Sequence, residues 1–180
     1  MYMEQTGMAR GDRFTAEDAV AIQHLKSATA LMQATLDDEI FKSLQTICGK
    51  KLTINLEELR QHGRYIAWAW FNAKWWIGIG YYKSPDDDDY PMVGLTIEVD
   101  PSSKSRATIV AEMRNLSETS RDWHPYNLDQ PHLWAGLKRW RSLADFLGEK
   151  DHVAAIRKYF AALIDDLALL KGKSRLPWEG

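Results

Sequence analysis

Cysteine is almost absent from this sequence, since Cys48 is the one cysteine among 180 residues. A single thiol cannot form an internal disulfide, which is typical of proteins from reducing compartments and unusual for small secreted domains. Residues 1–14 also lack the continuous apolar segment of a secretory signal, and we expect them to form a flexible tail. The sequence therefore predicts a cytoplasmic protein that folds without disulfides.

Long apolar runs and an excess of one charge are missing as well. The most apolar stretch, residues 65–82, is interrupted by Asn72 and Lys74. It falls short of the roughly 18 uninterrupted apolar residues that a membrane helix needs. The formal net charge of −2 at pH 7 gives no general attraction for nucleic acid. We expect no membrane contact, and we rank nucleic acid below a protein or peptide as a partner.

Patterns typical of metal, nucleotide or catalytic sites are also missing. The five histidines are not spaced as zinc-binding pairs. Gly78 and Gly80 alternate within an expected strand, unlike the glycines of a phosphate-binding loop that opens a helix. We therefore predict no metal and no cofactor and favour a non-enzymatic function, with Cys48 filling a small buried position.

The full sequence is 45% hydrophobic, and helical and strand patterns divide the chain after residue 14. Residues 14–49 have helical spacing and begin with Thr15 as N-cap and Asp18 three residues later. From residue 64 the apolar period changes to two, which indicates strands joined by short turns. Further helices are predicted over 56–62, 132–147 and 151–171, and strands over 64–71, 74–83, 92–100 and 106–114.

This pattern predicts an α+β fold, with an antiparallel four-stranded β-meander packed by N-terminal and C-terminal amphipathic helices. We expect a single domain over residues 15–171. Residues 172–180 are expected to form a second flexible tail, in which Trp178 is able to dock.

The turn between the first two predicted strands decides which side chains share a face. A two-residue turn over 72–73 places Trp70 opposite Trp75. Trp68 then lies opposite Ile77 on a wholly apolar face. The sequence therefore predicts that Trp68, Trp70 and Trp75 are core residues.

The opposite face would carry alanine and glycine, and such small residues in strands mark a close approach by something else. One explanation is a covering helix. The other is a ligand or peptide groove edged by aromatic residues and with a polar end. The candidate binding residues of this groove are Tyr65, Trp76, Tyr82, Glu98, Glu112 and Arg114.

Two further patterns suggest other functions. Asp100 followed by Glu112-Met113-Arg114 resembles the signature of restriction-nuclease-like enzymes, which has Asp and then Glu-x-Lys on the next strand. The resemblance implies a divalent-metal-dependent nuclease-like hydrolase, although Arg114 stands where the signature has Lys.

The second pattern is a basic patch of Lys138, Arg139 and Arg141 beside Trp134 and Trp140, on the helix predicted over 132–147. Basic and aromatic side chains together suit phosphate contact and base stacking, so nucleic-acid binding is another alternative. The leading hypothesis is a non-enzymatic protein- or peptide-binding accessory module, and a homodimer is also compatible with the apolar helix faces.

Overall fold

The structure, a computed structural model, describes residues 15–35, 38, 41, 44, 48, 51–61, 64–82 and 92–179. The chain divides into two compact units, Met1–Leu36 and Asp37–Gly180, where we expected one domain over 15–171. The predicted tail over 1–14 lies outside the described residues.

The described part of the first unit is one helix, α2 (Ala16–Thr35), with Thr15 at its start. The Thr15 backbone N–H donates to the Asp18 carboxylate at 2.8 Å, and the Asp18 N–H donates to the Thr15 hydroxyl at 3.2 Å. These reciprocal bonds satisfy donors that a helix start otherwise leaves unpaired. Hydrogen bonds from Thr15 also lower the pKa of Asp18. The predicted helix start is confirmed.

The second unit is built on one antiparallel sheet of six strands in the order β1-β2-β3-β4-β6-β5. The predicted α+β class with an antiparallel sheet is confirmed, but the predicted number of four strands is wrong. Along the chain, its elements are β1 (Glu57–Gln61), β2 (Arg64–Phe71), β3 (Trp75–Tyr82), β4 (Met92–Val99), α4 (Arg106–Thr119), β5 (His124–Tyr126), β6 (Ala135–Ser142), the 3-10 helix η2 (Leu143–Phe146) and α5 (His152–Lys173).

Two predicted helices are strands in the structure. Residues 57–61 form β1, and most of the range 132–147 is β6 followed by η2. In β6 the buried Ala135 and Leu137 alternate with residues on the other face, so the strand period of two is present. We predicted a helix here because charged residues interrupt the apolar alternation after Leu137.

One predicted strand, 106–114, is instead part of α4. Its buried residues Ile109, Val110 and Met113 recur at helical spacing. Ile109 and Met113 also satisfy a period of two, which is why the local pattern was ambiguous. The last predicted helix is confirmed as α5, which the Asp151 carboxylate caps by accepting from Ala154 N–H at 2.9 Å.

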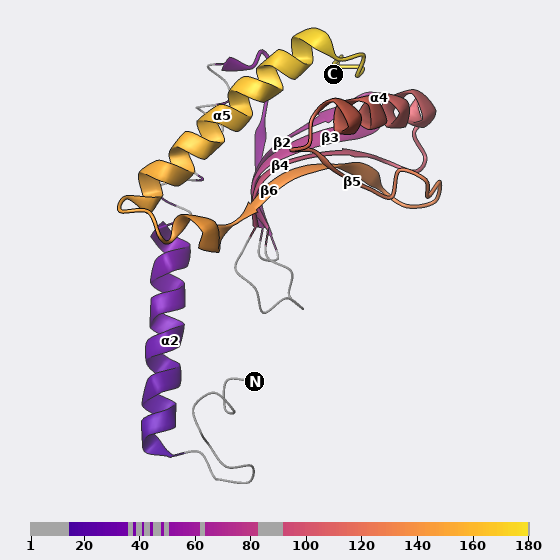
Figure 1. Cartoon of the computed structure of the whole chain (residues 1–180). Coiled ribbons are helices and arrows are strands. Elements are labelled where there is room, and N and C mark those ends of the chain that lie inside the picture. Colours follow the sequence, from indigo (N-terminus) through magenta and orange to yellow (C-terminus); the bar gives the residue numbers. More distant parts are fainter. Residues whose placement is uncertain are drawn as a thin grey trace. The chain divides into compact units, whose positions relative to one another are not determined.

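The core of the second unit lies between its helices and one side of the sheet, which we call the helix face. Figure 1 shows α4 and α5 on the same side of the sheet. Phe41 belongs to the same core, because its ring lies 4.5 Å from that of Tyr81 and 5.7 Å from that of Phe160. The sheet residues buried on this face are Ala67, Ala69, Phe71, Trp75, Ile77, Ile79, Tyr81, Val93, Leu95, Ile97, Val99, Ala135 and Leu137.

The segment after α5 packs against the same face. Leu176 is buried, and the Trp178 ring lies edge-on to those of Phe71 and Trp75, with centroids 5.7 and 5.1 Å away. The Trp75 indole N–H donates to the Pro177 carbonyl at 2.9 Å. The predicted docking of Trp178 is therefore found in the described part of this segment.

None of the helices in the described ranges combines the length and the apolar character that crossing a membrane requires.

Candidate functional site

The hairpin between β2 and β3 sets the two faces of the sheet, and its turn has three residues where we predicted two. The Lys74 N–H donates to the Phe71 carbonyl at 2.9 Å, and Lys74 has a left-handed backbone with φ of 55°. Phe71 is therefore paired with Trp75, and Trp70 with Trp76. This shifts the register by one residue, and a shift of one moves a strand's side chains to the other face.

The corrected register removes Trp68 and Trp70 from the predicted core. Both lie on the side of the sheet away from the helices, and 47% of Trp70 is exposed. Trp75 alone of the three stays in the core, fully buried. The small residues are also divided between the two faces of the sheet, because Ala67 and Ala69 face the helices whereas Gly78 and Gly80 do not.

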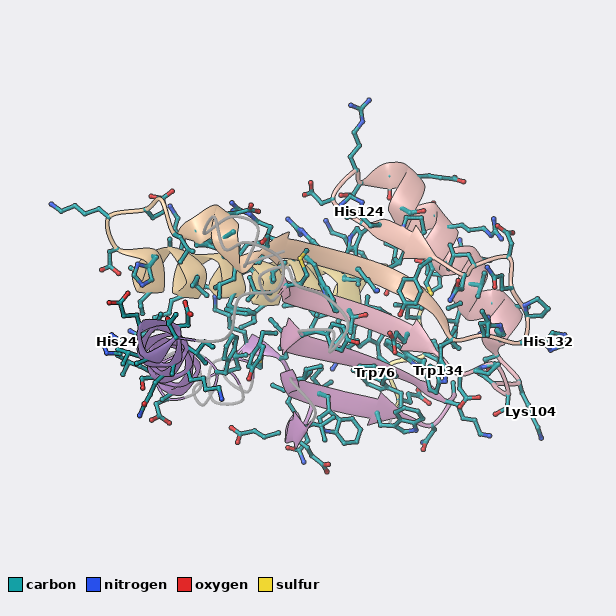
Figure 2. All side chains as sticks on the ribbon, turned by 90° about the horizontal axis from the view of Figure 1, so that it is seen from below. His24, Trp76, Lys104, His124, His132 and Trp134 are labelled. Carbon is teal, nitrogen blue, oxygen red and sulfur yellow. The ribbon has the colours of Figure 1, made fainter. Side chains whose placement is uncertain are left out.

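We call the side away from the helices the open face, and Figure 2 looks onto it with Trp76 labelled. Within the described part of this unit, the helices pack on the other side. The register assigns to the open face Glu57, Leu59, Ile66, Trp68, Trp70, Trp76, Gly78, Gly80, Tyr82, Met92, Gly94, Thr96, Glu98, Gly136, Lys138, Trp140 and Ser142, joined by His124 and Tyr126 of β5.

Aromatic rings lie across the glycines of the open face. A Cβ on Gly94 would stand 2.7 Å from both Cα and Cδ1 of Trp140, and a Cβ on Gly136 would stand 2.7 Å from the Tyr126 hydroxyl oxygen. A Cβ on Gly78 would meet the Trp76 ring at 2.6 Å. Aromatic side chains and the backbone of neighbouring strands therefore lie close to these glycines, whereas Ala67 and Ala69 face the helices, as one of our two explanations expected.

A polar cluster lies among these rings. The Tyr126 hydroxyl donates to the Glu98 carboxylate. Burial and the Glu98 charge raise the pKa of Tyr126 well above its ordinary value, so the phenol stays a neutral donor. The Lys138 ammonium lies 4.5 Å from the centre of the Tyr126 ring and 5.0 Å from that of the Trp140 ring. Such cation–π contacts hold a charge over an aromatic surface.

The most accessible aromatic residues form a connected row. The Trp70 ring lies 6.5 Å from that of Trp68 and 5.9 Å from that of Trp134, which is 37% exposed and precedes β6. Tyr82 meets Trp140 at 5.7 Å. The open face is thus an aromatic surface with one ammonium and one carboxylate at its centre.

Three of the six predicted groove residues come together on this face, namely Trp76, Tyr82 and Glu98. The side chain of Tyr65 lies outside the described part of the chain. Glu112 and Arg114 belong to α4 and are elsewhere: Glu112 accepts from the Arg175 N–H at 3.1 Å, and Arg114 pairs with Asp129. The predicted polar end of the groove is wrong at these two positions.

The predicted basic patch is divided between the two faces, because its residues lie on a strand. Lys138 belongs to the open face. Arg139 points to the helices, where it pairs with Asp166 and, at 3.0 Å, with Asp122. Arg141 lies 3.5 Å from Asp145, with its guanidinium over the Phe146 ring. A continuous basic surface is therefore not formed by Lys138, Arg139 and Arg141.

The nuclease resemblance loses its structural basis, because Glu112 lies on a helix and not on a strand that follows Asp100. Hydrogen bonds from Ser102 lower the pKa of Asp100, which occupies a turn. The described residues contain no group of three or more His, Cys, Asp or Glu side chains placed to hold a metal ion.

The sequence reasoning missed Trp68, Trp70, Tyr126, Trp134 and Trp140 as members of this surface. One signal was available, since both parities of 66–71 are apolar, and this is typical of a strand with two contacting faces. Comparison of the chain with protein-family models, with curated proteins and with solved structures found no match.

Proposed function

We propose that this protein is a non-enzymatic binding module that holds a protein partner, in the form of a peptide segment, on the open face of its sheet. One observation carries the proposal: the helix face is closed by α4 and α5, whereas the open face presents rings at the surface. Contiguous exposed apolar surface on a folded protein marks interaction sites more often than chance. Tryptophan and tyrosine are also the residues that contribute most to binding energy at interfaces.

The charge distribution favours a protein segment over nucleic acid. A protein that binds nucleic acid neutralises phosphates with several lysines or arginines. The open face has Lys138 and Glu98, which both contact Tyr126, and Glu57 opposite Trp68, while Arg139 and Arg141 are paired with carboxylates toward the helices or η2. A surface with apolar rings and both signs of charge suits a peptide that offers apolar and polar side chains together.

Selection from a random peptide library, followed by affinity measurements on single peptides, tests this proposal. Trp134 is the best position to change, because it reaches the surface and lies just outside the strands of the sheet. We expect Trp134→Ala to weaken the selected peptides by at least about tenfold, as for an interface hot spot. Leu147→Ala is the matched control, since Leu147 is an exposed apolar residue that follows η2 and belongs to no strand of the sheet.

Three outcomes would reject the proposal. The first is a library that yields no binder of the wild-type chain. The second is equal loss of affinity in the Trp134→Ala and Leu147→Ala variants. The third is binding of single-stranded oligonucleotides that weakens steeply with salt and is lost in Lys138→Gln, which would assign the face to nucleic acid.

A further inference from the structure

Strand β2 extends beyond its outer neighbour. The pairing of β1 with β2 ends at Glu57 opposite Trp68, whereas β2 continues to Phe71. The Phe71 carbonyl accepts from Lys74 within the hairpin, so it points toward β3. Backbone groups alternate in direction along a strand, and those of Trp70 therefore point to the outer edge. In the described part of the chain, no backbone hydrogen bond continues the β1 ladder to Trp70.

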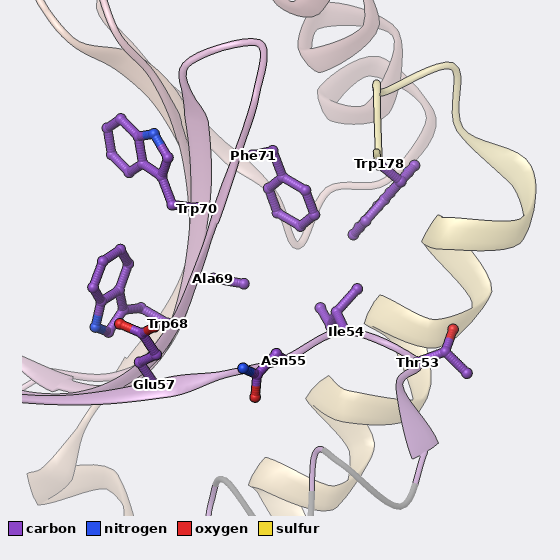
Figure 3. Close-up of a pocket in the computed structure, with 9 residues that line it drawn as sticks. All are labelled: Thr53, Ile54, Asn55, Glu57, Trp68, Ala69, Trp70, Phe71 and Trp178. Carbon is purple, nitrogen blue, oxygen red and sulfur yellow. The ribbon is translucent and has the colours of Figure 1, made fainter. Parts of the chain in front are cut away.

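A pocket of about 430 Å³ occupies the place where β1 would have continued. Residues 53–55 turn away from β2 and close one end of it (Figure 3). We call this pocket the edge notch, and the lining residues that matter are Asn55, Glu57, Trp68, Trp70, Phe71 and Trp178.

The edge notch has two walls of different chemistry. Figure 3 shows Trp68 and Trp70 on one side of β2, and Phe71 and Trp178 on the other. The first wall includes the exposed Glu57 carboxylate, directly across the strand pair from Trp68. The second wall is apolar, with the Phe71 and Trp178 rings edge-on at 5.7 Å. An extended chain placed along β2 would present alternate side chains to these two walls.

The first wall is complementary to a cation. Glu57 makes no ion pair with any residue in the described ranges. A carboxylate beside indole rings attracts an ammonium or guanidinium group, because the charge attraction and the negative ring faces act together. Arginine suits such a place well, since its planar group both stacks on rings and pairs with carboxylates.

We infer that the edge notch binds an extended peptide by strand addition to β2, with a lysine or arginine between Glu57 and the rings of Trp68 and Trp70. The neighbouring residue of that peptide is apolar and faces Phe71 and Trp178. The backbone groups of Trp70 supply hydrogen bonds, as in other cases of strand addition to a sheet edge. This inference rests on the proposed function and names the edge at which the peptide enters.

Fluorescence polarisation with labelled hexapeptides tests the side-chain preference. The probes are alternating arginine and valine, alternating glutamine and valine, and alternating glutamate and valine. We expect the arginine peptide to bind best and Glu57→Gln to weaken it by about five- to tenfold. Glu58→Gln is the matched control, because Glu58 is the exposed adjacent carboxylate with the same charge, on the other side of β1. We expect it to change the affinity less than twofold.

Two further measurements address the mode of binding. Glu57→Lys is expected to reverse the order, so that the glutamate peptide binds best. N-methylation of single peptide nitrogens is expected to abolish binding at alternate positions only, because only every second residue turns its N–H toward β2.

Equal weakening by Glu57→Gln and Glu58→Gln would overturn the inference, since it would show attraction by net charge alone. Tolerance of N-methylation at every position would overturn strand addition. Library peptides that lose affinity in Trp134→Ala but not in Glu57→Gln would leave the proposed function standing and reject the edge notch as its entry site.

Discussion

On the helix face of the sheet, branched and aromatic side chains of the strands pack against residues from α4 and α5. On the open face, aromatic rings pack over glycines of neighbouring strands. Phe160 and Ile77 are almost fully buried on the first side, whereas Trp70 and Trp134 are exposed on the second. Both faces are apolar, so hydrophobicity alone does not separate core from surface here. The difference lies in what covers each face.

The two faces therefore differ in what a substitution removes. On the helix face a truncated side chain leaves a cavity between elements that cannot close around it. On the open face a truncated ring exposes a glycine and its neighbours to solvent and leaves no enclosed cavity. Stability is expected to reside on one side and recognition on the other.

Phe160→Ala has the largest expected effect on stability. The Phe160 ring is buried, 5.7 Å from Phe41 and 6.1 Å from Tyr159. We expect the free energy of unfolding to fall by about 3–5 kcal/mol, as for other buried phenylalanines. Urea denaturation followed by circular dichroism measures it. A loss below about 1 kcal/mol would show that the helices do not close this face as tightly as the structure indicates.

The second largest expected effect is a loss of stability at alkaline pH, caused by a buried thiol and a partly buried phenol of the second unit. Burial raises the pKa of Cys48 from 9.0 to about 12. The unfolded chain loses this proton first, so the stability is fully present below about pH 9 and falls as pH rises toward 12. One such group contributes a loss of about 1.4 kcal/mol per pH unit.

Urea denaturation from pH 8 to pH 11 measures this slope, and Cys48→Ala is the control that removes the thiol contribution. Burial also raises the pKa of Tyr159 to about 12. Part of the slope above pH 10 should therefore persist in the control. An identical slope in both proteins below pH 10 would contradict the burial of Cys48.

Gly94→Ala tests how closely the backbones of β4 and β6 pack on the open face. Its Cβ would collide with the Arg139 carbonyl and stand 2.7 Å from the Trp140 Cα, and both are backbone atoms that cannot swing away. We expect a loss of about 1–3 kcal/mol. Gly148→Ala is the control, because nothing lies within 4 Å of a Cβ there. Equal thermal midpoints for the two variants would mean that β4 and β6 separate easily at this point.

Trp70→Ala has the smallest expected effect on stability and separates stability from binding most clearly. With 47% of Trp70 exposed, we expect a loss of about 1 kcal/mol or less. The same change should weaken peptide binding by at least about tenfold, because Trp70 belongs to both the open face and the edge notch. A large loss of stability with unchanged binding would place Trp70 in the core after all.

Local pattern was sufficient for the long, regular parts of the fold. The cap of α2 at Thr15 and Asp18, the strands β2 to β4 and the stripe of α5 were all predicted, since each depends on neighbours in the sequence. The open face was not predicted, because its composition depends on the register of one hairpin and on β6, whose residues we expected in a helix.

That register depends on contacts distant in the sequence. The Lys74 carbonyl accepts from Asp100 N–H at 2.9 Å, and the Lys74 ammonium donates to the Ser102 hydroxyl at 2.9 Å. The Ser103 hydroxyl donates to the Ala73 carbonyl. These bonds brace a three-residue turn with lysine at a position that usually holds glycine. Nothing in the residues of the turn itself distinguishes it from the two-residue turn that we predicted.

The row of Trp68, Trp70 and Trp134 also has an optical consequence. The planes of the first two rings meet at 79° and those of the second pair at 62°, at centroid distances of 6.5 and 5.9 Å. Transition dipoles this close and this oblique couple, and coupled indoles produce paired bands of opposite sign in far-ultraviolet circular dichroism. The spectrum should therefore carry an indole couplet on top of its α+β signal. Such a couplet would change sharply when a ligand settles on these rings, and so would give a label-free record of occupancy.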